Sequence, residues 1–160
     1  MIVVSCSAIG FSMSRSCKRR GESIDSFISA LEIIKSEIVF KNGSVEDIFS
    51  ILPQKSNGAS SDFFQSLCRD RSELALDTIL NESDIRLKKY DLKQPEIDEI
   101  YNILKVLGKY DLSTQTDFLN KAINRLEDIY AKADEEYSKN GKLYKAIGVT
   151  IGLIIGLLLL

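Results

Sequence analysis

The chain has 160 residues, of which 44% are apolar and 28% are charged, and it contains three Cys but no His and no Trp. This length suits one domain, and a total of only nine Gly and two Pro residues excludes a linker-rich chain. Without His, the sequence lacks the commonest general base and the imidazole ligands of metal sites. We therefore expect a protein that is not an enzyme and needs no metal or cofactor.

The charged residues divide the chain into an acidic middle and two basic flanks. All 23 acidic residues and 14 of the 21 basic residues lie between Glu22 and Glu136, which gives this middle a formal charge of −9. The other seven bases are Arg15, Lys18, Arg19 and Arg20 on the N-terminal side, and Lys139, Lys142 and Lys145 on the C-terminal side. Basic residues beside apolar chain ends are typical of membrane proteins. Because the middle of the chain is this acidic, it would repel nucleic acid, and we expect no nucleic-acid partner.

Residues 1–14 form an apolar segment that is too short to span a membrane alone. Three interpretations stay open: the remainder of a spanning helix that starts upstream, a short signal-anchor, or a packed N-terminal segment. A cleaved signal peptide fits poorly, because the basic cluster follows the apolar stretch instead of preceding it. The three cysteines, Cys6, Cys17 and Cys68, have neither metal-ligand spacing nor an even count, so they predict no zinc site and no disulfide framework.

Residues 15–140 are predicted to form a cytosolic domain, a compact all-α bundle of five to seven helices. Apolar residues at helical spacing predict a helix over 21–40, ended by Asn42 and Gly43. Its inner face carries Ile24, Phe27, Ile28, Leu31, Ile34 and Ile38. A second helix starts at Ser44, which forms a near capping box with Asp47, and is stopped by Pro53.

The next part of the chain is predicted to hold a loop over 55–61, a helix capped by Ser61, and a further helix over 72–81. Pro95 fits the first turn of another helix, and Gly108 suits the position just past its end. Ser113 or Thr114 starts a long helix that only Gly141 separates from the C-terminal apolar run. Its predicted inward residues are Phe118, Leu119, Ala122, Ile123, Leu126, Ile129, Tyr130, Ala133 and Tyr137. No stretch alternates as a strand does.

Residues 141–160 end in fifteen residues without a charge, and they predict a C-terminal transmembrane helix. A buried core helix is the alternative. Gly148, Gly152 and Gly156 fall four residues apart, a spacing that permits close helix packing and homo-oligomers through this helix, although Gly is also common in spanning helices. The positive-inside bias puts the main domain in the cytosol, with both termini directed across the membrane and the basic flanks near anionic lipid head groups.

Four stretches together resemble the stage III sporulation protein AB family. The first is the apolar start IVVSCSAIGF followed by the basic cluster, and the second is the helix end from Leu31 through Glu37 to Phe40. The third and most specific is the segment LGKYDLSTQ, with Leu107, Gly108, Asp111 and Gln115 at the positions that the family pattern fixes. The fourth is KLYKAIG, at residues 142–148, followed by Gly152. The sequence departs from the pattern at 43–44, where Thr-Pro is expected, and at Tyr110, which replaces a Ser.

The resemblance implies a non-enzymatic membrane component of the channel complex between mother cell and forespore, located in the mother-cell membrane. It further implies a cytosolic part similar to the F-type platform domains of type II secretion machines, and a secretion-type cytosolic ATPase and other channel components as partners. From the charge pattern we add the hypothesis that the acidic surface engages this ATPase. The alternatives are a tail-anchored helical scaffold or regulatory binding module unrelated to secretion, and a membrane-bound enzyme that uses only carboxylates and lysines.

Overall fold

The computed structural model describes residues 2–41, 44–70, 82–83 and 85–158, and within these ranges it is helical without any strand. The elements are α1 (Ile2–Lys41), α2 (Val45–Lys55), α3 (Gly58–Asp70), the short 3₁₀ helix η1 (Lys88–Tyr90), α5 (Gln94–Val106) and α6 (Leu112–Leu158). The predicted all-α class is confirmed, and the number of helices in the described ranges agrees with the predicted five to seven. The helix predicted over 72–81 lies outside the described residues.

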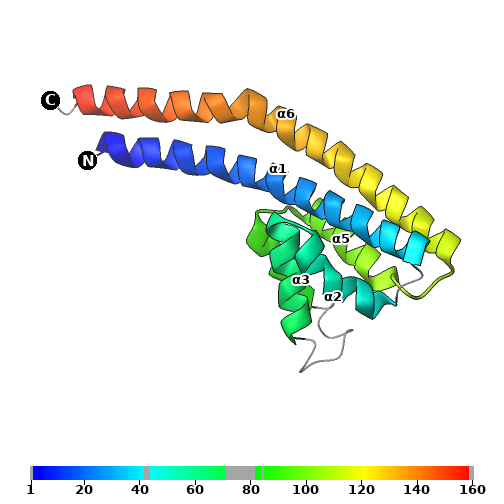
Figure 1. Cartoon of the computed structure of the whole chain (residues 1–160). Coiled ribbons are helices and arrows are strands. Elements are labelled where there is room, and N and C mark those ends of the chain that lie inside the picture. The colour runs from blue at the N-terminus through cyan, green and yellow to red at the C-terminus, as the bar shows by residue number, and fades with distance from the viewer. Residues whose placement is uncertain (1, 42–43, 71–81, 84, 159–160) are drawn as a thin grey trace.

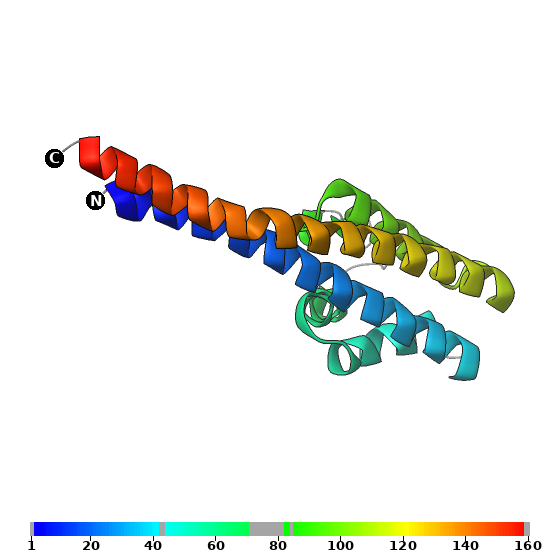
Figure 2. The ribbon, with the colours of Figure 1, turned by 90° about the horizontal axis from the view of Figure 1, so that it is seen from above.

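Two long helices set the shape of the molecule. α1 and α6 run antiparallel along their whole length, so both chain ends lie side by side at one end (Figures 1 and 2). The shorter helices gather beside the other half of this pair (Figure 1). The protein is therefore elongated, and the predicted compact bundle describes only the half of the molecule where α2, α3 and α5 lie.

The N-terminal segment is continuous with the first predicted helix. α1 begins at Ile2, whereas the sequence predicted a helix only from Gly21 onward. Gly21 does not interrupt the helix; it lies where a Cβ atom would be 3.8 Å from the ring of Tyr130, so α1 and α6 approach closely there. Because no residue before Gly21 breaks the backbone hydrogen bonding, the helix extends through the basic cluster.

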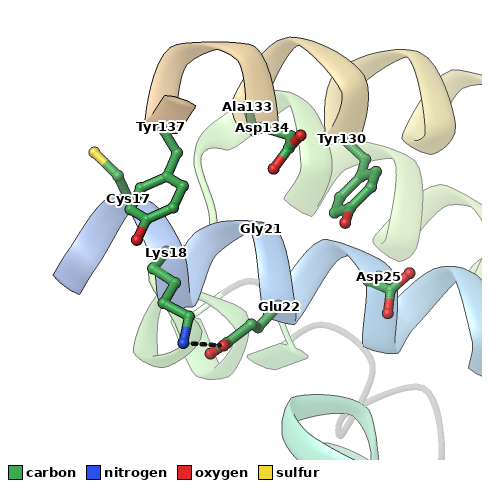
Figure 3. A pocket seen from close by; sticks show the side chains of 9 residues that line it. All are labelled: Cys17, Lys18, Gly21, Glu22, Asp25, Tyr130, Ala133, Asp134 and Tyr137. Atoms are coloured by element: carbon green, nitrogen blue, oxygen red, sulfur yellow. Dashed lines mark ion pairs between the residues drawn. The ribbon is translucent and has the colours of Figure 1, made fainter. Parts of the chain in front are cut away.

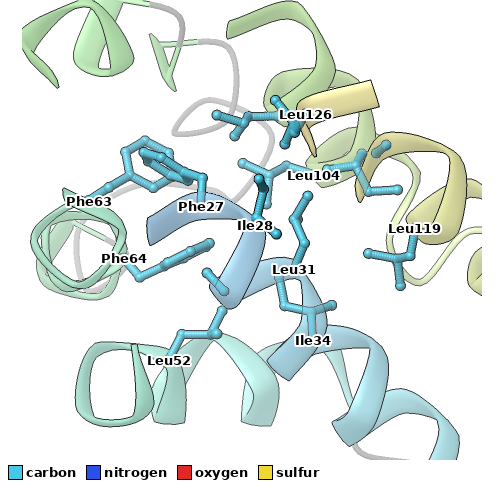
Figure 4. Close-up of a cluster of buried hydrophobic side chains, with 14 of the residues drawn as sticks. Phe27, Ile28, Leu31, Ile34, Leu52, Phe63, Phe64, Leu104, Leu119 and Leu126 are labelled. Carbon is cyan, nitrogen blue, oxygen red and sulfur yellow. The ribbon is translucent and has the colours of Figure 1, made fainter. Parts of the chain in front are cut away.

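The core is apolar and centres on the middle of α1. All six inner residues predicted for this helix are buried, and they meet side chains from α2, α3, α5 and α6 (Figure 4). The rings of Phe27 and Phe63 meet edge to face with centroids 5.6 Å apart. On α6, the buried residues Leu119 and Leu126 confirm the predicted inner face. Phe118 was wrongly predicted to be inward: it is 37% exposed and pairs with Tyr110 at the surface.

Ser44 caps α2 as predicted, its Oγ accepting a hydrogen bond from the backbone N–H of Asp47. Pro53, however, does not end the helix, which continues to Lys55. A proline removes the N–H that would bond to the carbonyl four residues earlier, here Phe49. The thiol of Cys68 on α3 donates to that Phe49 carbonyl at 3.1 Å, so the lost hydrogen bond is replaced from a neighbouring helix.

α3 begins at Gly58, earlier than the predicted start at Ser61, and the loop before it consists of Ser56 and Asn57 alone. Gly58 has a positive φ of 61°, which lets the chain turn directly into the helix. The hydroxyl of Ser26 on α1 accepts a hydrogen bond from the N–H of Ser60 at 2.9 Å. This contact satisfies one N–H group of the first turn of α3, in place of the predicted cap.

In the described part of the chain, no helix offers a stretch both long and apolar enough to cross a membrane. Within the predicted anchors, residues 1–14 and 141–160, the backbone is helical over 2–14 and 141–158, but most side chains there lie outside the described set. The boundaries of these segments stay predictions.

Candidate functional site

The segment that carries the most specific family pattern is the connection between α5 and α6. α5 ends at Val106, Leu107 is buried, and Gly108 adopts a positive φ of 77°. A Cβ atom on Gly108 would lie 2.6 Å from Cγ2 of Val45 at the start of α2. Gly108 is therefore required twice, for its backbone conformation and for the close approach of the turn to α2.

Asp111 and Gln115 complete this turn. The Asp111 carboxylate accepts hydrogen bonds from the backbone N–H of Thr114 at 3.1 Å and from its hydroxyl at 2.7 Å, so Asp111 caps α6. These bonds lower the pKa of Asp111. Gln115 reaches back across the turn, accepting from the N–H of Gly108 at 2.9 Å and donating to the carbonyl of Tyr110 at 2.6 Å. α6 begins at Leu112, one or two residues before the predicted start at Ser113 or Thr114.

Glu37, the remaining family-like position, is buried near the end of α1. Its carboxylate accepts a hydrogen bond from the ammonium group of Lys55, the last residue of α2. Like the turn residues, Glu37 joins two elements of the fold, which is a structural role.

The two predicted basic flanks lie opposite each other on the antiparallel helices α1 and α6. Several of their residues form ion pairs with acidic residues. Lys18 pairs with Glu22 at 3.3 Å, Arg19 pairs with Asp91 at 3.0 Å, and Lys139 pairs with Glu135. Lysine pairing lowers the pKa of Glu135. Arg15 is exposed. The structure does not describe the side chains of Lys142 and Lys145, nor the surroundings of Gly148, Gly152 and Gly156.

Arg20 differs from the other members of its cluster because its side chain is only 13% exposed and points into the domain. Its guanidinium donates from Nε to Glu96 Oε1 at 3.0 Å and pairs with Glu136 at 3.2 Å. Glu96, in the first turn of α5, is fully buried, and its Oε2 has no hydrogen-bond partner among the described residues. Arg20 thus holds α1, α5 and α6 together, and it is not available to lipid head groups.

A groove of about 210 Å³ lies between α1 and α6, next to the basic flanks. Its lining residues are Cys17, Lys18, Gly21, Glu22 and Asp25 from α1, and Tyr130, Ala133, Asp134 and Tyr137 from α6. Figure 3 shows both tyrosine rings pointing from α6 toward α1, with the Asp134 carboxylate between them. Three carboxylates and one ammonium group line the groove, so it carries a net negative charge.

The comparisons with known proteins agree with this architecture. A family model described as stage III sporulation protein AB matches residues 1–160. The chain therefore belongs to the stage III sporulation protein AB family. The stage III sporulation protein AB of Bacillus subtilis (strain 168) is 25% identical over 163 residues, which cover 99% of this chain and 95% of that protein. A solved structure of a stage III sporulation protein AB is 19% identical, with a TM-score of 0.63, and covers 74% of this chain and 96% of the other.

Membership of the stage III sporulation protein AB family confirms the resemblance and supports a sporulation-related role. Sequence reasoning did not find two features, the Arg20–Glu96 pair and the groove. The pair joins positions 76 residues apart, and no local pattern marks it. A local signal for Glu96 did exist, since an acid directly after Pro95 is typical of a helix start. The groove depends on the register between α1 and α6, which the sequence pattern does not specify.

Proposed function

We propose that this protein is a membrane-anchored, non-enzymatic platform in a secretion-like channel complex of sporulation, where it couples a cytosolic ATPase to the channel. The observation that carries the proposal is the antiparallel α1–α6 pair, which brings both chain ends to one end of the molecule (Figure 1). Family membership supplies the sporulation context. In this arrangement the two ends enter the same membrane, and α2, α3 and α5 stay on its cytosolic side.

The terminal half of α6 supports the anchoring. Ile147 and Ile154 are 43% and 55% exposed, and their separation of seven residues puts them on one face of the helix. Exposed large apolar side chains at regular spacing are expected where lipid is the solvent. The exposed bases Arg15 and Lys139 lie on the domain side of these residues, where head groups would meet them.

The exposed carboxylates of the domain support the ATPase contact. They occur on α1, α3, α5 and α6, at Glu32, Asp62, Asp98, Asp117, Glu127 and Asp128. Such a surface steers and orients a basic partner more than it adds affinity, and screening by salt weakens it. Binding of the purified full-length chain to the ATPase should therefore fall as ionic strength rises. Binding that ignores salt would contradict the charge-based contact, and failure to copurify would favour a scaffold unrelated to secretion.

Protease accessibility in membrane vesicles tests the topology. We expect the domain of the full-length chain to be cleaved in inverted vesicles, which expose the cytosolic face, and to be protected in right-side-out vesicles. Release of the chain by an alkaline carbonate wash would contradict anchoring. Cleavage only from the outside would reverse the topology and remove a cytosolic ATPase as a direct partner.

A further inference from the structure

The groove between α1 and α6 is lined by aromatic rings and by small residues. Tyr130 and Tyr137 are half-buried and present their rings, while the small residues Gly21 and Ala133 form the floor between the helices. Aromatic faces attract the cationic heads of Lys and Arg, and their apolar surface accommodates the methylene stems of the same side chains. The walls alone thus suit a long basic side chain.

The carboxylates of the groove are not all neutralised. Glu22 pairs with Lys18, but the carboxylates of Asp25 and Asp134 form no ion pair or hydrogen bond within the described part of the chain. By contrast, Glu135 and Glu136, the two acids that follow Asp134, are both paired. Two unpaired carboxylates facing one groove with aromatic walls are complementary in charge to a basic ligand.

The position of the groove indicates where that ligand comes from. The groove starts at Cys17 and Lys18, inside the N-terminal basic cluster, so under the proposed function it opens at the cytosolic surface of the membrane. Cytosolic flanks of membrane-spanning helices are enriched in Lys and Arg. We propose that the groove binds the basic cytosolic flank of a neighbouring transmembrane protein, with one Lys or Arg between the tyrosine rings beside Asp134, while Asp25, on the far side of Tyr130, adds to the negative charge of the groove. This inference rests on the proposed anchoring.

The test uses the full-length chain in phosphatidylcholine nanodiscs, with Cys6 and Cys68 changed to Ser so that only Cys17 reacts with maleimide. The probe is a spanning peptide of Leu and Ala with four Lys at its cytosolic end, and the control peptide carries four Gln there. Occupancy of the groove should shield Cys17. We expect the Lys peptide, but not the Gln peptide, to slow Cys17 labelling, and 0.5 M salt, at which the Debye length is only about 4 Å, to reverse the effect.

Matched variants separate the groove from general charge. Asp25→Asn with Asp134→Asn should weaken peptide protection about tenfold, because it removes both unpaired charges. Glu32→Gln with Asp117→Asn makes the same charge change at exposed positions of the same two helices and should leave protection intact. Equal protection by the Gln peptide, or full protection in the Asp25 and Asp134 variant, overturns the inference while leaving anchoring in place. A chain that washes out of the bilayer overturns the proposed function and this inference with it.

Discussion

At the scale of single residues, Gly108 carries the sharpest constraint. Replacement by Ala meets both a positive φ and an approach of 2.6 Å to Val45, so we expect Gly108→Ala to destabilise the fold by about 2 kcal/mol. Gly21→Ala is the matched control, because its Cβ would meet only an ordinary contact at 3.8 Å within a helix. That variant should be neutral or stabilise by up to about 1 kcal/mol. Denaturant unfolding of both variants checks the difference, and a Gly108 variant as stable as the Gly21 variant would contradict it.

Asp111 makes stability depend on pH. The hydrogen bonds from Thr114 lower the pKa of Asp111 in the folded protein. Its contribution to the free energy of unfolding is therefore complete above the ordinary aspartate pKa of about 3.9, and it is lost as the pH falls through the lowered pKa. Asn caps a helix as well as Asp does but does not titrate. We expect Asp111→Asn to match the original protein at pH 7 and to lose less stability on acidification. Thermal unfolding from pH 7 to pH 3 measures this, and parallel curves for the two proteins would contradict it.

The residues that the sequence predicted correctly act through local rules. Ser44, Pro95 and Gly108 take the positions expected of a cap, a first-turn proline and a residue past a helix end. The start of α6 was misplaced because Asp111, Ser113 and Thr114 are all suitable caps within four residues, and only the backbone decides among them. Arg20 was grouped with its neighbours because its buried partner Glu96 is distant in the sequence.

At the scale of elements, the Arg20–Glu96 pair joins α1 to α5 in a largely buried site. Arg20→Met should cost roughly 3 kcal/mol, because it leaves the Glu96 carboxylate buried without its counter-charge. Adding Glu96→Leu should recover most of that loss, since an apolar pair removes the unpaired charge. Denaturant unfolding of the two single variants and the double variant gives the coupling free energy between Arg20 and Glu96. If the stability losses of the two single variants simply added in the double variant, that would contradict the pairing.

Helix bodies were predictable, whereas helix ends depended on contacts between elements. The inner face of α1 followed from the spacing of Ile24 through Ile38. The continuation of α2 past Pro53 depends on the Cys68 thiol from α3, and the early start of α3 depends on the Ser26 hydroxyl from α1. No pattern in the neighbouring sequence predicts either contact, so the predicted end of α2 and the predicted start of α3 differ from those in the structure.

At the scale of the whole molecule, the antiparallel α1–α6 pair fixes the relation of the two chain ends. We expect reporters fused to the N-terminus and to the C-terminus to be found on the same side of the membrane. Alkaline phosphatase, which is active only outside the cytosol, and green fluorescent protein, which fluoresces inside it, give opposite readings at each end. Active phosphatase at one end together with a fluorescent protein at the other would contradict the paired arrangement.

Because α6 is unbroken from Leu112 to Leu158, it fixes the rotation of its terminal apolar segment about the helix axis relative to the domain. Each residue of an α-helix turns the chain by about 100°, and no loop in α6 absorbs an error in that angle. One residue inserted after Lys139 would rotate Ile147 and Ile154 by more than a quarter turn relative to the domain. Seven inserted residues, close to two full turns, would restore their direction but move them by about 10 Å along α1. The rotation of the terminal apolar segment relative to the domain is therefore fixed, and only insertions or deletions of about seven residues between them keep the direction of its exposed face.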